Sequence, residues 1–572
     1  MDSREFTLRA LVLGVLLAVV FGAANAYLGL KAGMTVSASI PAAVVSMAIL
    51  RGLLRSGTIL ENNIVQTIAS AGESLAAGVI FTVPALILLG LNPSLFLIFL
   101  VAATGGLLGV LLMVPIRKHL IEDEHETLPY PEGTACAEVL EAGEEGGRKA
   151  GEVFLGMGLG ALLKLLPAGF RLYPGAPSVF LRPLKTVLGV DLSPALVGVG
   201  YILGLRISAL VLAGGVLGWF VFIPLIAHLQ AIPLHGADQV FEIWHTRIRY
   251  IGAGAVLAGG IVSLLRSFPA ILATLRNLRL GQSRRDLPLA WVLLGVTLGF
   301  LLLWLGPWFG LGFYGALFSV LFAFLFVLVS ARIVGIVGSS SNPVSGMTIA
   351  TLLVTALIFV KLGASGAAGM LKVLTLGAVV CIAAAIAGDT AQDLKTGFLV
   401  GATPWKQQIG ELVGVLTSAV FIGWTLYLLH HAYTIGSREL SAPQATLMSL
   451  VVKGVFEGNL PWFLVGTGVF TALTVELLGI PSLPFAVGLY LPLELSTSLA
   501  VGGLVAYATR HTQQGVLFAS GLVAGDALTG ILIALALTLG LRLPAGVGFP
   551  PLAWVALVTL AALLYWRGRN RA

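Results

Sequence analysis

Charged residues are scarce in this chain. Only 10% of its 572 residues are Asp, Glu, Lys or Arg, whereas 58% are hydrophobic, and the mean hydropathy is +0.99. Soluble domains carry about 25% charged residues, so this composition excludes the ordinary soluble class. The largest polar segment, residues 117–151, is too short for a nucleotide-binding domain.

Several signatures of catalysis and of ATP use are also missing. The sequence contains no G-x-x-x-x-G-K-[ST], no H-E-x-x-H and no G-x-S-x-G motif. Its two cysteines, Cys136 and Cys381, lie far apart and lack metal-site spacing, so neither a disulfide framework nor a zinc site is indicated. We therefore expect no enzyme activity, no cofactor and no metal site.

What the chain does have is a series of apolar runs. A spanning helix needs about 20 mainly apolar residues, and about sixteen such runs occur between residues 8 and 566. The 71 glycines suit the close approach of helix backbones in lipid. The sequence predicts an all-α polytopic membrane protein of about sixteen transmembrane helices.

Basic residues concentrate near the two ends and at one middle loop. These residues are Arg4, Arg9, Arg276, Arg279, Arg284, Arg285, Arg567, Arg569 and Arg571. The excess of positive charge in cytoplasmic loops predicts that both termini and the middle loop are cytoplasmic. The first apolar run continues into NAYLGLKAG without a cleavage site, so we expect a retained first span and not a removed signal peptide.

The middle loop divides the chain into two parts that resemble each other. Residues 201–215 match residues 490–503 with one gap, and shorter matches recur in the same order. We predict an N-terminal half (1–275), a basic cytoplasmic linker (276–287) and a C-terminal half (288–572). With about eight helices each, the halves would share one orientation across the membrane.

The stretch 59–90 is long enough to span a bilayer and still carries polar side chains. Asn62, Gln66 and Glu73 recur at helical spacing, and Asn63 is adjacent to this stripe. A carboxylate at the bilayer centre costs about 2.5–3.5 kcal/mol, so Glu73 must face protein, water or a ligand. We select Asn63 and Gln66 as candidate solute-binding residues and Glu73 as a candidate proton-coupling site.

The end of the first run carries Asn25, Tyr27 and Lys31, close to the helix-weakening glycines Gly29 and Gly33. Lys31 either neutralises an anionic substrate at a helix break or reaches toward the membrane interface. We predict that Asn25, Tyr27 and Lys31 contribute to substrate binding.

A Ser-rich segment, GSSSNPVSGMT, begins a later apolar run and contains Asn342 and Ser345. This composition suits an unwound segment that lines a substrate path, although an N-cap followed by proline explains Asn342-Pro343 equally well. We predict that Asn342 and Ser345 are hydrogen-bonding substrate ligands.

Further carboxylates lie in or next to apolar runs. Asp389 and Asp393 are four residues apart and would share one helix face, either as a proton site or at the end of a cytoplasmic helix. Glu494 and Asp526 interrupt otherwise apolar segments, which in a membrane indicates function. We predict that Asp389, Glu494 and Asp526 take part in proton coupling.

Seven motifs spread over the chain carry a resemblance to a known family. They are NAYLGLKAGMT, NNIVQTIASAGESLAAGVIF, LPYPEGTACAEVL, VGSSSNPVSGMTIATLL, AGDTAQDLKTGFLVGATPWKQQ, VVKGVFEGNLPW and LPFAVGLYLPLELSTSLAVGG. In this order they resemble the oligopeptide transporter (OPT) family from about residue 5 to about residue 540. The resemblance implies a symporter of about sixteen spans that moves peptides or peptide-like metal chelates with protons.

The NPG and KIPPR motifs of the fungal and plant peptide-transporting branch are absent. The sequence is more similar to prokaryotic members and to the yellow stripe-like branch, which carries metal complexes. The resemblance supplies no residue-level site, so the residues above are chosen for their buried polarity.

We therefore predict a proton-coupled symporter that imports oligopeptides or peptide-like metal chelates across the inner membrane. Its expected partners are the solute, protons and membrane lipid, with no nucleic acid and with homodimer formation left open. The alternatives are a passive channel and, with less support, an intramembrane enzyme.

Overall fold

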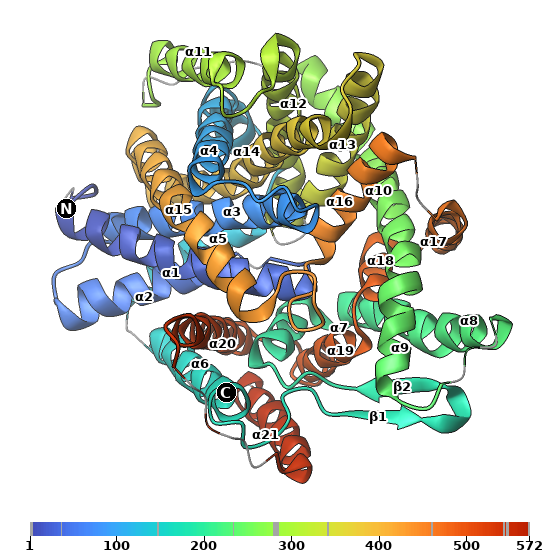
Figure 1. Cartoon of the computed structure of the whole chain (residues 1–572). Helices are drawn as coiled ribbons and strands as arrows, with labels where there is room; N and C mark the ends of the chain where they lie inside the picture. Colours follow the sequence, from blue (N-terminus) through green and yellow to red (C-terminus); the bar gives the residue numbers. More distant parts are fainter. Residues whose placement is uncertain are drawn as a thin grey trace.

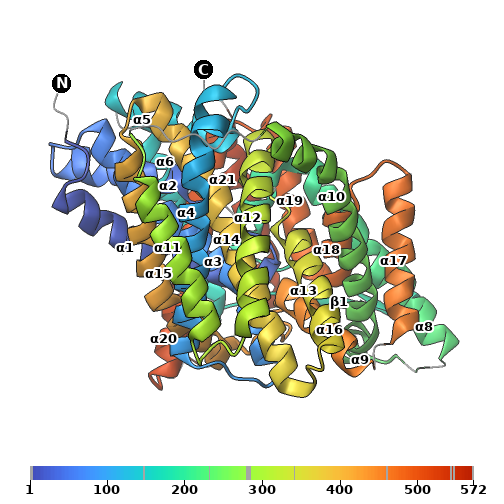
Figure 2. The same cartoon turned by 90° about the horizontal axis from the view of Figure 1, so that it is seen from above.

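The computed structural model describes residues 4–35, 37–145, 148–230, 232, 234–277, 285–339, 342–458, 461–541, 544 and 548–569. Within these residues the chain forms a bundle of helices with one short β-hairpin (Figure 1). The long helices run in broadly the same direction, and both ends of the chain lie at the same end of the bundle (Figure 2).

Eleven helices in the described ranges are long and apolar enough to cross a membrane. They are α1 (Leu8–Ala32), α3 (Ile59–Leu88), α4 (Leu95–Arg117), α6 (Arg148–Lys164, extended by a π-helical turn to Gly169), α7 (Pro194–Val216, extended through α8, Ile223–Leu229), α12 (Gly312–Val337), α13 (Val344–Lys361), α14 (Gly366–Val400), α15 (Pro404–Tyr433), α20 (Gln513–Thr538) and α21 (Pro550–Gly568).

The remaining helices are shorter or more polar. Four of them are short apolar segments: α2 (Ser39–Met47, extended by a π-helical turn to Leu53), α11 (Leu289–Leu305), α17 (Trp462–Leu477) and α19 (Leu493–Ala508). The others are α5 (Pro131–Glu145), α9 (Ala237–Ile243), α10 (Arg249–Asn277), α16 (Pro443–Glu457) and α18 (Ser482–Tyr490).

These helices confirm the predicted all-α, polytopic class. Eleven long and four short apolar helices lie within the described part of the chain, so the expected number of about sixteen spans stays a prediction. The middle loop lies between α10 and α11, and residues 278–284 of the predicted linker 276–287 fall outside the described residues, so the division at this linker stays a prediction. The similarity of the two halves also stays a prediction.

Local sequence signals account for several helix ends. At the start of α3, Thr58 and Glu61 form a capping box in which each side chain accepts from the other residue's backbone N–H. At the start of α1, the Thr7 side chain accepts from the backbone N–H of Ala10. At its other end, Gly33 adopts a left-handed conformation that terminates the helix.

Pairs of helices pack through reciprocal glycine contacts. A Cβ on Gly200 of α7 would collide with Leu499 of α19, and a Cβ on Gly502 of α19 would collide with Val197 of α7. Helices α6 and α20 have the same relation, as do α10 and α17. Such small residues let backbones approach closely where lipid gives no hydrophobic driving force between helices.

The hairpin pairs β1 (Ser178–Leu181) with β2 (Thr186–Gly189) in an antiparallel register. Ser178 lies opposite Gly189, and a Cβ on Gly189 would come within 2.6 Å of the Glu494 side chain. The hairpin therefore packs directly against the start of α19 and positions the chain that follows it.

Candidate functional site

A central cavity of about 460 Å³ lies where several helices are interrupted. Its wall includes the α1–α2 connection, the α12–α13 connection and the start of α18. The kink of α7 at Gly204, where φ is +75°, brings Leu203 and Ile207 to the same wall. Breaks of this kind free backbone groups inside the membrane for contact with a solute.

Two of these breaks depend on glycine. Gly33 has a φ of +71°, and a Cβ there would collide with the ring of Pro443. Gly338 has a φ of +86°, and a Cβ there would lie 3.0 Å from a carboxylate oxygen of Glu132. Larger side chains are therefore disfavoured at both positions by backbone conformation and by space.

Four of the predicted site residues line the central cavity: Glu73, Asn342, Ser345 and Asp389. Asn25 lies behind Glu73, and its side-chain amide donates to Oε1 of that carboxyl. The backbone N–H of Ala38 donates to Glu73 Oε2 at 3.3 Å, while Asn342 Nδ2 donates to Ser330 Oγ at 2.7 Å. The hydrogen bonds to Glu73 fix the orientation of its carboxyl at the cavity wall.

Two more carboxyls, Asp393 and Glu411, lie deeper in the protein beyond Asp389. Both are completely buried, and Gln66 Nε2 donates to Asp393 Oδ1. Gln66 is therefore one layer behind the cavity and not on its surface. Asn63 is also completely buried, and neither atom of its side-chain amide has a hydrogen-bond partner among the described residues.

The four carboxyls of Glu73, Asp389, Asp393 and Glu411 share one property. Each is at most 7% exposed, and none forms an ion pair with any residue that the structure describes. Charge in such a place is costly, because burial removes most of its hydration and no cation among the described residues compensates for it. We define these four residues as the carboxyl ladder.

Glu411 is not among the site residues that the sequence predicts. It lies in α15, an apolar helix, and the criterion that selected Glu494 and Asp526 would have selected it as well. Asp393 was recognised only as the neighbour of Asp389 on one helix face. Their association with α3 could not be read from the sequence, because it depends on how α3, α14 and α15 pack.

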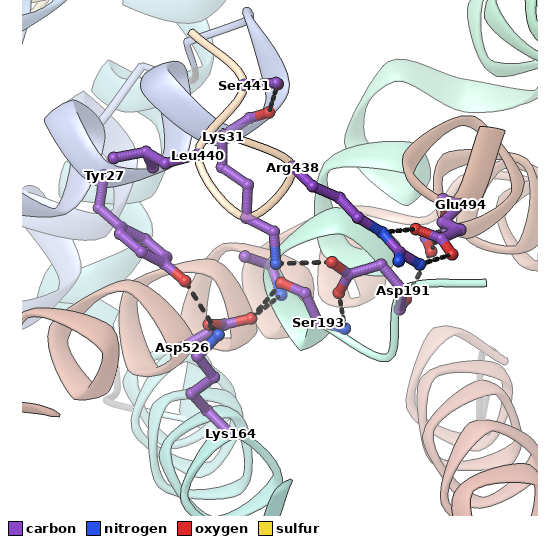
Figure 3. Close-up of polar contacts among 12 residues, drawn as sticks. Tyr27, Lys31, Lys164, Asp191, Ser193, Arg438, Leu440, Ser441, Glu494 and Asp526 are labelled. Atoms are coloured by element: carbon purple, nitrogen blue, oxygen red, sulfur yellow. Dashed lines mark hydrogen bonds and ion pairs between the residues drawn. The ribbon is translucent and has the colours of Figure 1, made fainter. Parts of the chain in front are cut away.

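A second cavity of about 500 Å³, here called the charged cavity, lies beside the hairpin (Figure 3). It contains the other predicted residues Tyr27, Lys31 and Glu494 on its wall. Lys31 Nζ lies 2.8 Å from Asp191 Oδ2, and Arg438 pairs with Glu494 (Figure 3). The Lys31–Asp191 pair joins α1 to the segment after the hairpin. The Arg438–Glu494 pair joins the α15–α16 connection to the start of α19.

Asp526 adjoins the charged cavity, and a nearby lysine also compensates its negative charge. Lys164 Nζ lies 3.5 Å from Asp526 Oδ1 and donates to the Tyr27 hydroxyl at 2.9 Å. The backbone N–H of Ala195 donates to Asp526 Oδ2 at 2.9 Å, and the Ser193 hydroxyl donates to the same oxygen. The three carboxylates of Asp191, Glu494 and Asp526 thus each face a cation, unlike the carboxyl ladder.

A wall at the end of α1 separates the two cavities. The backbone N–H of Ala442 donates to Leu30 O at 2.7 Å, and Ser441 Oγ donates to Lys31 O at 3.0 Å. Gln444 Nε2 donates to Gly33 O at 3.3 Å. Lys31 lines the charged cavity and Gly33 lines the central cavity, so the wall is only a few residues thick along α1.

The two cavities reach solvent toward opposite ends of α10. Arg266, at the central cavity, has a 59% exposed side chain and lies 2.6 Å from Glu476. Arg249 lies about 25 Å from Arg266 along α10, at roughly 1.5 Å per residue. Its side chain donates to Gly436 O at 3.2 Å, and Gly436 is close in sequence to Arg438 of the charged cavity.

The central cavity faces the end of the bundle that carries the termini. Beyond Arg266, α10 leads into the middle loop, where Arg285 O accepts from the backbone N–H of Trp405 at 3.0 Å. The next residue, Lys406, pairs with Glu5 at 3.2 Å. The charged cavity, with exposed Arg171 and Glu439 on its wall, therefore faces the other end.

Comparison with known proteins agrees with this architecture. The family model described as "OPT oligopeptide transporter protein" matches residues 5–537. A Haemophilus influenzae protein named "Putative oligopeptide transporter" is 33% identical over 584 residues, which cover 89% of this chain and 92% of that protein. "Metal-nicotianamine transporter YSL3" of Arabidopsis thaliana is 23% identical over 651 residues, covering 96% of this chain and 94% of that protein. Together with the helical membrane fold, these matches establish that the chain belongs to the OPT family of transporters.

Proposed function

We propose that this protein is a proton-coupled symporter that imports a peptide-like solute, either an oligopeptide or a metal chelate, across a prokaryotic inner membrane. The observation that carries the proposal is a cavity at helix breaks whose wall contains Glu73 and Asp389, neither of which forms an ion pair with a described residue. Carboxyls in such a place exchange protons more readily than they hold a permanent charge.

The size and chemistry of the central cavity support a solute of this class. Its volume of about 460 Å³ lies within the range of about 300–1,000 Å³ found for small-molecule sites. Asn342 and Ser345 would supply hydrogen bonds to the amides or carboxylates of the solute. The relatives named as oligopeptide and metal-nicotianamine transporters support both solute types, and substrate screening decides between them.

Two cavities that face opposite ends of the bundle support alternating access over a passive channel. The wall at the end of α1 interrupts the path between them. We propose that the termini are cytoplasmic, as the basic residues near both ends indicate. The central cavity would then be the inward-facing compartment and the charged cavity the outward-facing one.

The ion-paired residues take a different role in this proposal. Lys31, Glu494 and Asp526 each have a partner of opposite charge in the charged cavity. We propose that they remain charged and stabilise the closed wall, whereas Glu73 and Asp389 carry the coupled protons. Asn25 would orient Glu73, and Tyr27 would orient Lys164.

The test is uptake by the purified protein in liposomes with an imposed pH gradient, acidic outside. One proton driven by about 100 mV is worth roughly 2.3 kcal/mol, enough for about 50-fold accumulation of a neutral solute. Accumulation of a labelled peptide or iron chelate that collapses with a protonophore is the expected result. Uptake that only equilibrates the solute and ignores the gradient would contradict the proposal and favour a channel.

A further inference from the structure

Asp393 and Glu411 form a buried pair of carboxyls without a cation. Asp393 lies on α14 and Glu411 on α15, and the two side chains are within hydrogen-bonding reach of each other. Neither oxygen of Glu411 accepts a hydrogen bond from an N–H or O–H donor in the described structure, and Asp393 Oδ2 also lacks one. Three completely buried acceptor atoms therefore have no donor.

A proton between the two carboxyls would remove this deficit. A buried acceptor without a donor costs about 1–3 kcal/mol, and more if it is charged. Two carboxyls in contact cannot both be ionised without strong repulsion, so such pairs hold one proton between them. The proton turns one group into the donor that the other lacks.

The surroundings of the pair contain further acids. The titratable groups near it are Glu73 of α3, Cys136 of α5 and Asp389 of α14, and Glu132 of α5 lies near Glu73 and Asp389. No cation among the described residues forms an ion pair with either member. Ser39 and Gln66 donate hydrogen bonds to Asp393, and the hydroxyls of Ser70 and Thr390 lie nearby, but none of these neighbours carries a charge.

The pair is connected to the central cavity through Asp389. Asp389 lies on the cavity wall, and Asp393 follows it by four residues on α14, which places both carboxyls on one helix face. Asp389 Oδ1 also lacks a hydrogen-bond partner in the described structure. The ladder thus runs from Glu73 and Asp389 on the cavity wall inward to the completely buried Asp393 and Glu411.

We infer that Asp393 and Glu411 share one proton and act as the internal proton store of the transporter, loaded from the central cavity through Asp389. In the loading step the O–H bond of the Asp389 carboxyl breaks and the proton binds the singly protonated pair. Asp389 is left as a carboxylate, and the pair changes from a total charge of −1 to neutral. Return of the proton to Asp389 unloads the store.

This inference rests on the proposed proton coupling and assigns the coupling to residues outside the cavity wall. A substitution at Glu411, which does not line the central cavity, is therefore expected to uncouple transport from protons without preventing solute binding. Glu411→Gln is the decisive variant, because glutamine has nearly the same shape as a protonated glutamate and cannot release a proton. Ser418→Ala, seven residues further along α15 and also buried, is the matched control.

The experiment compares two modes of transport in liposomes. Exchange of labelled for unlabelled solute needs no net proton movement, whereas uphill uptake driven by a pH gradient does. We expect Glu411→Gln to lower exchange by at most about twofold and uphill accumulation by at least about tenfold, and Ser418→Ala to change neither. Uphill accumulation retained by Glu411→Gln would overturn the inference.

Infrared spectroscopy of the wild-type protein gives an answer that does not depend on whether a variant folds. The shared proton predicts a carbonyl band from a protonated carboxyl at neutral pH, which is lost in Glu411→Gln and in Asp393→Asn. A wild-type spectrum without such a band overturns the inference. By contrast, wild-type uptake that ignores the pH gradient overturns the proposed function, whatever the infrared result.

Discussion

Carboxyl groups line both cavities, but Glu73 and Asp389 of the central cavity face no cation among the described residues, unlike three carboxylates at the charged cavity. Asp191, Glu494 and Asp526 pair with Lys31, Arg438 and Lys164. Glu73 and Asp389 have hydrogen-bonding amides, hydroxyls or backbone groups around them and no ion pair within the described residues. Similar residue types therefore occupy two electrostatic environments on the two sides of one thin wall.

The difference indicates a division of roles. A paired carboxylate stays ionised over a wide pH range and holds segments together, and removing one member leaves an uncompensated charge. An unpaired buried carboxyl can change its protonation state at a much lower cost. Proton coupling is thus expected on the central side and closure of the path on the charged side.

Neutralising the unpaired carboxyls of the central cavity should have the largest effect on transport. Glu73→Gln and Asp389→Asn are each expected to abolish uphill accumulation, a loss of about 50-fold for one proton at 100 mV. Solute exchange should persist, because both substitutions keep the shape of the protonated side chain. Accumulation ratios in liposomes with an acidic exterior measure the effect. Uphill uptake that survives both substitutions would contradict the assignment.

Neutralising the paired side should act through stability. Lys31→Met leaves the partly buried Asp191 without its cation and is expected to destabilise the protein by up to about 3 kcal/mol, measured by thermal unfolding in detergent. The double variant Lys31→Met/Asp191→Asn should recover most of this loss, and its uptake should still respond to pH. A double variant as unstable as Lys31→Met would show that the unpaired charge of Asp191 does not cause the loss of stability.

Chemical access tests whether the two cavities face opposite sides. Ser339→Cys lines the central cavity, and Ala176→Cys lines the charged cavity. An impermeant thiol reagent should label each variant at least about tenfold faster from its own side, in inside-out and right-side-out vesicles respectively.

The unmodified protein is the control in the labelling experiment. Both native cysteines are buried, and burial raises the pKa of the Cys136 thiol, so its reactive thiolate is scarce. Labelling of both variants from one side only would contradict the opposite orientation of the cavities.

Loss of an exposed ion pair away from both cavities should have the smallest effect on stability and on uptake. Lys453 and Glu457 lie 3.7 Å apart on α16, with side chains 50% and 39% exposed. Lys453→Ala is expected to change the free energy of unfolding by less than about 0.5 kcal/mol and to leave uptake unchanged. A large loss of uptake would mean that charge outside the cavities also takes part in transport.

The sequence was sufficient for the fold class and for several residues of the central cavity. Long apolar runs identify membrane helices because hydrocarbon requires them, and polar residues within such runs are rare enough to stand out. Glu73, Asn342, Ser345 and Asp389 were selected in this way and lie around one cavity. The glycines flanking Lys31 likewise indicated the break at the end of α1.

The sequence could not distinguish the two environments. Glu494 and Asp526 appear in the sequence just as Glu73 does, as single acids in apolar runs, and their cations come from distant segments. Lys164 reaches Asp526 from α6, and Arg438 reaches Glu494 from the α15–α16 connection. Burial can be inferred from local sequence, whereas the charge of the neighbour depends on tertiary packing.

The reciprocal glycine contacts limit how this molecule can rearrange. Because the backbones of α7 and α19 touch at Gly200 and Gly502, the two helices cannot slide past each other without steric collision. The same restriction joins α6 to α20 and α10 to α17. Each pair should therefore move as a rigid body, and the hinges of the transport cycle should fall at the interruptions near Gly33 and Gly338.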